Sequence, residues 1–134
     1  MIIDRFQLIH DLRRALTALA KAKIEMERAK YRLAYLDAEM PLERARAERR
    51  AIEAAGSEKA LGSNAEARKR ALILALDDDE QYQVHLTLID QARKQLLEAV
   101  QAYELAKVDA EVARARLNLA LLEVEEAKDE VHVV

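Results

Sequence analysis

The sequence predicts an all-α protein in which two long helices form an antiparallel coiled-coil hairpin, with a short capping helix at the tip. Three observations lead to this fold class. Both ends of the chain repeat apolar residues every seven positions, the middle holds both glycines, and helix breakers are scarce, with one proline in 134 residues. Charged residues make up 35% and hydrophobic residues 51% of the chain. This composition is typical of long helices that bury a narrow seam instead of a large core.

The N-terminal arm, residues 1–55, carries the first repeat. Two series that alternate in steps of three and four residues correspond to the core positions of a coiled coil. One series is large and consists of Leu12, Leu19, Met26, Leu33 and Met40. Its partner series is mostly alanine and consists of Leu8, Ala15, Ala22, Ala29 and Leu36. A strict seven-residue repeat of this kind predicts a left-handed supercoil.

Pro41 interrupts this arm directly after Met40. Proline removes a backbone donor and its ring clashes with the preceding turn, so it either kinks a helix or ends it. We favour a kink, because a helix over residues 1–55 would match the second arm in length. A break at Pro41 is the alternative.

The turn between the arms is predicted at residues 56–64, which contain Gly56 and Gly62. A short tip helix is expected over residues 65–76. Ser63 with Glu66 three residues later fits a capping box for this helix. Asp77, at the head of an acidic cluster, is the predicted N-cap of the second long helix.

The C-terminal arm, residues 78–131, has the clearest pattern. Its large series is Tyr82, Ile89, Leu96, Tyr103, Ala110, Leu117, Val124 and Val131. Its partner series begins at His85 and is then alanine at every seventh residue up to Ala127. An uninterrupted helix of this length would be roughly 75 Å long. Large residues can pack over alanines between the two arms, or between copies of one arm, and both pairings are open. His85 is interpreted as a tolerated polar residue or as a register marker near the tip.

Several function classes are not expected from the residues present. The chain has no cysteine, its three histidines are far apart, and two glycines cannot build a phosphate-binding loop. We therefore predict no enzyme activity, no metal site and no cofactor. No stretch of about 18 apolar residues suggests a membrane span, so no membrane partner and a cytoplasmic location are expected.

Charge is unevenly distributed along the chain. Residues 1–40 carry a net charge of +2, residues 41–76 carry +3, and residues 77–134 carry −8. The two arms could therefore attract each other, or their charges could simply be solvated. A basic tip is defined by Arg44, Arg46, Arg49, Arg50, Arg68, Lys69 and Arg70. It is a candidate nucleic-acid site whose binding would weaken with salt. The alternatives are a solvated surface and ion pairs with the acidic second arm.

The segment around the turn resembles a known class of proteins. The residues that carry the resemblance are Gly62-Ser63-Asn64-Ala65-Glu66-Ala67-Arg68, followed by Leu72, Leu76, Asp78 and Tyr82. They are similar to small coiled-coil proteins of phage and prophage genomes, in which a Gly-x-Asn-Ala-x-x-Arg segment joins two long helices. The resemblance implies a host-cell location and a place near recombination or single-strand-annealing genes. It also implies that Asn64 and Arg68 are recurrent polar residues. The residues themselves suggest a turn or cap role for Asn64 and a surface or tip-bracing role for Arg68.

Three functions follow as hypotheses. The first is a non-enzymatic coiled-coil interaction protein, a phage-encoded accessory of DNA replication or recombination that acts through protein contacts and the basic tip. The second is an inhibitor of a host nuclease or defence complex that presents the acidic second arm. The third is a purely structural or chaperone-like hairpin. Apolar residues beside the seams predict a homo-oligomer, a dimer or larger; they are Ile2, Ile9, Leu16, Leu86, Val100 and Leu121.

Overall fold

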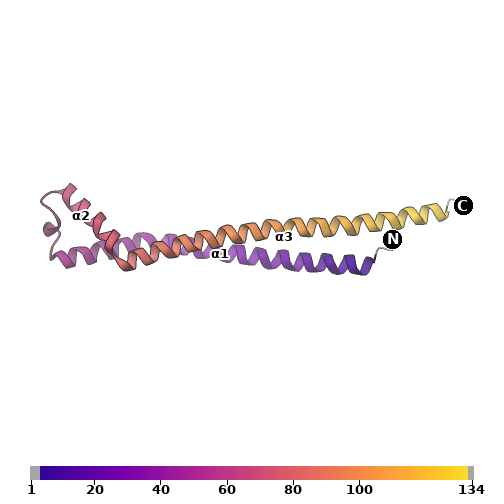
Figure 1. The fold of residues 1–134 in the computed structure, drawn as a ribbon, viewed down its shortest axis with the longest axis horizontal. Coiled ribbons are helices and arrows are strands. Elements are labelled where there is room, and N and C mark those ends of the chain that lie inside the picture. Colours follow the sequence, from indigo (N-terminus) through magenta and orange to yellow (C-terminus); the bar gives the residue numbers. More distant parts are fainter. Residues whose placement is uncertain (1–3, 133–134) are drawn as a thin grey trace. The chain divides into compact units, whose positions relative to one another are not determined.

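The computed structural model describes the backbone of residues 4–132 and the side chains of residues 4–128. Helix α1 spans Arg5–Ala55, the short 3-10 helix η1 spans Lys59–Leu61, α2 spans Ala65–Asp78 and α3 spans Glu80–His132 (Figure 1). No strand occurs in this described part of the chain. The predicted all-α class is confirmed, and helix packs on helix as in helical bundles.

Helix α1 continues through Pro41 to Ala55 without a break. The pattern of burial also continues beyond the proline. Glu43, Ala47 and Arg50 follow Leu36 and Met40 at heptad spacing, and each is less exposed than its neighbours on the outer face. The predicted seam ended at Met40, because two of the later seam positions hold charged residues and the apolar repeat is not visible there in the sequence.

A glycine ends α1. Gly56 has a positive φ of 95°, which side chains disfavour, and its N–H donates to the carbonyl of Ile52 at 3.0 Å. This is the usual way in which a helix C-terminus satisfies its last carbonyl groups.

The caps of the next two helices differ from the predicted ones by one or two residues. Asn64, and not Ser63, caps α2: its Oδ1 accepts the N–H of Ala67 at 2.8 Å. Helix α2 runs to Asp78, so Asp77 lies inside it, and Asp79 precedes α3. The Oδ1 of Asp79 accepts the N–H of Tyr82 at 2.9 Å. Several neighbouring side chains could cap each helix, and at α3 the one that caps it, Asp79, also contacts Arg50.

The turn before α2 is tightly folded around Gly62. A Cβ atom at this position would lie 2.7 Å from the Cβ of Ala67, a distance that real structures do not contain. The carbonyl of Gly62 accepts a hydrogen bond from Nε of Arg68 at 3.1 Å. In this segment Gly62, Asn64 and Arg68 therefore all serve the local fold. The expected capping role of Asn64 and bracing role of Arg68 match these contacts.

The chain divides into two units, each with its own packed seam. In the unit formed by Ala29–Leu96, Leu36, Ile89 and Ala92 form a buried cluster. Three half-buried side chains pack against it, namely Leu33, Met40 and Leu88.

The other unit combines α1 up to Arg28 with α3 from Leu97 onward, and Met26, Ala110 and Ala120 are buried there. The remaining large seam residues of the two units are half-buried: Leu12, Leu19, Tyr82, Leu96, Tyr103, Leu117 and Val124. The side chains of Val131 and His132 lie outside the described residues.

Candidate functional site: the tip and the outer helix faces

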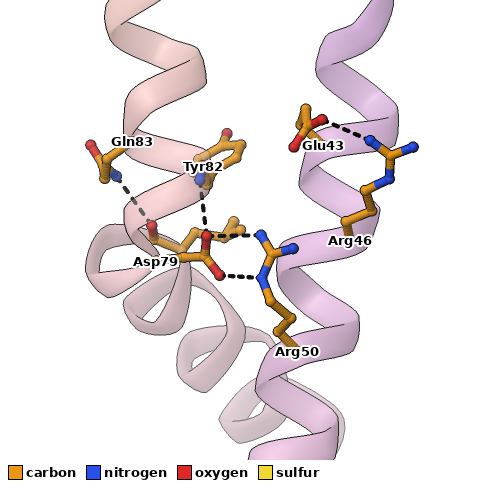
Figure 2. Close-up of polar contacts among 7 residues, drawn as sticks. Glu43, Arg46, Arg50, Asp79, Tyr82 and Gln83 are labelled. Atoms are coloured by element: carbon orange, nitrogen blue, oxygen red, sulfur yellow. Dashed lines mark hydrogen bonds and ion pairs between the residues drawn. The ribbon is translucent and has the colours of Figure 1, made fainter.

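An ion pair joins the end of α1 to the junction between α2 and α3 (Figure 2). Nε of Arg50 donates to Oδ2 of Asp79 and an Nη of Arg50 donates to Oδ1, both at 2.9 Å. This two-point geometry is among the stronger and more directional ion pairs in proteins. Asp79 also caps α3 through Tyr82, so one carboxylate holds both the helix start and the contact with α1.

The pair changes the acid–base properties of both groups. The hydrogen bond from Arg50, followed by that from the Tyr82 N–H, lowers the pKa of the Asp79 carboxyl below its ordinary value. The hydrogen bond with Asp79 raises the pKa of the Arg50 guanidinium. Each partner therefore favours the charged form of the other.

Lowering the pH is expected to destabilise the fold at this tip, because Asp79 loses its charge. Because its folded-state pKa is depressed, the carboxylate stabilises the fold above the unfolded pKa of about 3.9, and this contribution is lost as pH falls through the folded value. Asp79→Asn keeps a capping oxygen but removes the charge. We expect it to lower the Tm at pH 7 by roughly 3 °C, a figure kept small because Arg50 is partly solvated. The difference from wild type should be smaller at pH 3 than at pH 7, because the unfolded-state carboxyl is then mostly protonated. Circular dichroism melts at both pH values measure this.

Asp77→Asn provides the matched control, because Asp77 is exposed on α2 and takes no part in the pair. This variant should melt like the wild type at both pH values. A Tm loss in Asp79→Asn that is equally large at pH 3 and pH 7 would assign the effect to the cap geometry and not to the charge.

A second polar contact lies on the seam. His85 is buried, and its Nε2 lies 3.0 Å from the carbonyl oxygen of Leu36. With a proton on Nε2 the ring donates to that carbonyl. Since a hydrogen bond tolerates little sliding, His85 holds α3 at one axial position against α1, in line with its interpretation as a register marker.

Most of the basic tip is occupied by local contacts. Arg46 pairs with Glu43 at 2.8 Å, Arg44 with Glu48 at 3.2 Å and Arg70 with Glu66 at 4.0 Å. The first of these pairs appears beside the Arg50 contact in Figure 2. Arg50 and Arg68 are held by Asp79 and by the Gly62 carbonyl.

Arg49 and Lys69 are exposed and pair with no carboxylate among the described residues. Among the contacts of the described side chains, Arg50 is the one tip cation that reaches an acidic residue beyond its own helix. Nucleic-acid binding by the tip remains a prediction.

The face of α1 opposite its seam carries a second apolar row, which we call the tyrosine stripe. It consists of Tyr31, Tyr35, Ala38, Leu42 and Ala45. These residues recur at steps of four and three, so they share one side of the helix. The two tyrosines are 83% and 65% exposed.

The face of α3 opposite its seam carries another such row, which we call the α3 stripe. It consists of Leu105, Val108, Val112, Ala115, Leu119 and Leu122. Its five large side chains are 44–63% exposed. Further apolar contacts were predicted beside the seam. Of the residues named there, Ile9, Leu16 and Leu121 are exposed, whereas Leu86 and Val100 are half-buried. Ile2 lies outside the described residues. A heptad count on the outer faces would have found both stripes.

Other kinds of site are not apparent in the part of the chain that the structure describes. No three acidic, histidine or cysteine side chains there converge as metal ligands would. No helix within this part is long and apolar enough to cross a membrane. No protein-family model, curated protein or solved structure matches the chain.

Proposed function

We propose that this chain is a non-enzymatic helical interaction protein, built as an antiparallel coiled-coil hairpin that self-associates. As the resemblance of its turn segment suggests, it would serve phage DNA replication or recombination as an accessory. It would act through protein contacts, and the exposed tyrosine stripe of α1 is the observation that carries this proposal.

Two contacts support the hairpin arrangement. Leu36 of α1 meets His85, and Arg50, further along α1, meets Asp79, which precedes His85 in the sequence. Moving forward along α1 thus corresponds to moving backward toward the start of α3, as it does between antiparallel helices. Both contacts lie within the unit Ala29–Leu96.

The tyrosine stripe suits a protein partner. Two large aromatic rings on successive turns offer much apolar area with few rotatable bonds, and their hydroxyl groups keep them soluble while unbound. Tyrosine is accordingly among the residues that contribute most to binding energy at protein interfaces. Leu42 and the small Ala38 and Ala45 extend this surface along the helix, which fits a helical or extended partner.

The tyrosine stripe should be needed to capture the partner. Affinity capture from host cells in which the chain is naturally expressed should enrich proteins of DNA replication or recombination. Tyr31→Ala/Tyr35→Ala should reduce this enrichment at least about tenfold, because two interface tyrosines commonly contribute over 1 kcal/mol each. Quantitative mass spectrometry of the captured proteins measures the change.

A matched control is Lys94→Ala/Glu98→Ala, which removes two exposed α3 side chains at the same spacing without altering net charge. It should capture the same proteins as the wild type. If the tyrosine variant retains them, the stripe is not the binding surface. If the chain instead binds DNA in a salt-sensitive way that Arg49→Ala/Lys69→Ala abolishes, the basic tip carries the function. Capture of a nuclease or defence complex without DNA, dependent on the acidic end of α3, would favour the inhibitor hypothesis.

A further inference from the structure

We infer that the α3 stripe is a homodimer interface, on which α3 of a second copy packs in the antiparallel direction. This inference deepens the proposed self-association by naming its surface and symmetry. It involves a different helix from the tyrosine stripe, so the two can be tested separately.

The spacing of the α3 stripe identifies its occupant as a helix. From Leu105 to Leu122 the steps are three, four, three, four and three, as in the core of a coiled coil. The stripe lies on the side of α3 opposite the seam. Ala110 and Ala120, which belong to the seam, are already buried. A solvated helix face needs no such repeat, and the row ends in polar residues on both sides, Gln101 and Glu126.

The size of the α3 stripe fits pairing with a copy of itself. Five large apolar side chains exposed to this degree present on the order of 500 Å² per chain, the upper range for a patch on a monomer. Two copies together would bury about 1,000 Å², near the lower limit for a specific interface. In the antiparallel register, Val112 packs against Ala115 of the partner and Leu105 against Leu122.

The charges beside the α3 stripe favour the antiparallel direction, because its like-charge contacts fall beyond the ends of the stripe. Asp109 and Arg116 lie one heptad apart along the same edge. An antiparallel copy places Asp109 of each chain beside Arg116 of the other, which gives two symmetric ion pairs, as a twofold axis requires. A parallel copy would place Glu111 beside Arg116, two opposite charges, but also Glu104 beside Asp109, two like charges of which Asp109 lies within the stripe. The antiparallel arrangement brings Glu104 toward Glu125 at the ends of the stripe, where Lys107 already pairs with Glu104 at 3.7 Å.

The test is sedimentation equilibrium of the full chain and its charge variants. The wild type should be a dimer at micromolar concentration. Asp109→Arg and Arg116→Asp should each raise the dimer Kd about tenfold, because each replaces two attractive contacts by two repulsive ones. An equimolar mixture of the two variants should dimerise with a Kd within about threefold of wild type, since each chain then meets the opposite charge. Val112→Glu should raise the Kd at least about 100-fold by burying charge in the apolar stripe.

Circular dichroism checks that each variant remains helical. Gln91→Glu, at an exposed position of α3 well before the stripe, adds the same charge as Val112→Glu and should leave the dimer intact. A monomeric wild type at 100 µM, or a dimer that Val112→Glu does not weaken, would overturn the inference. A mixture that associates no better than its separate components would overturn the antiparallel register. The capture experiment on the tyrosine stripe is unaffected by any of these results.

Discussion

Replacing Ile89 by alanine is expected to lower the free energy of unfolding by about 3 kcal/mol, because the substitution leaves a cavity in a narrow core. Ile89 is 4% exposed and lies in the cluster with Leu36 and Ala92. A seam between helices has few other large side chains to refill the space. The loss would therefore be a large fraction of the 5–15 kcal/mol typical of a domain. Urea denaturation followed by circular dichroism at 222 nm measures it.

Leu97→Ala is the matched control on the same helix. Leu97 is 59% exposed, so its truncation removes little buried surface and should change the unfolding free energy by less than about 1 kcal/mol. Both variants must be compared at one protein concentration, since self-association would add to the apparent stability. Equal losses in the two variants would contradict the buried cluster around Ile89.

Enlarging Ala92 to leucine is expected to cost about 2–3 kcal/mol, the second large effect. Ala92 is 1% exposed and belongs to the buried cluster with Leu36 and Ile89, where a small side chain permits the backbones of the two helices to approach. Leucine favours helix almost as much as alanine does, so helix propensity cannot account for such a loss. The same urea experiment would detect it, together with a broader or less cooperative transition if the seam separates.

Ala102→Leu tests the explanation, because Ala102 is an exposed alanine of α3. The leucine should be accommodated there with a change below about 0.5 kcal/mol. If Ala92→Leu proved as stable as the wild type, the alanines of the seam would not be needed for close packing. The alternation of large residues and alanine would then have a different origin.

The outcomes at the turn show how far local sequence reasoning reaches. The glycines, the asparagine and the acidic cluster predicted the N-caps of α2 and α3 to within two residues of their observed positions. Ser63 and Asn64 can both cap a helix, as can each aspartate from Asp77 to Asp79. Asp79 is the one that also reaches Arg50, 29 residues away in sequence. A contact at that separation leaves no trace in the local pattern.

The charge pattern of the sequence was similarly insufficient to predict the ion pairs of the basic tip. Net charge predicted a basic tip and an attraction between the arms. In the structure, three of the six tip arginines pair with carboxylates three or four residues away on the same helix. These pairs form because residues at that spacing share a helix face, and the short distance makes them cheaper in chain entropy than contacts between helices.

The sequence alone determined that this protein is helical and which face of each long helix is buried. The heptad repeat does this because a helix converts a spacing in sequence directly into a position on its surface. The tertiary structure decided the continuation of the seam through Pro41, the choice of Asp79 as cap and partner of Arg50, and the bond of His85 to Leu36. It also left the outer stripes of α1 and α3 exposed. Each of these outcomes depends on which residues from distant parts of the chain meet, and a repeat along one helix does not specify which residues of another segment lie opposite it.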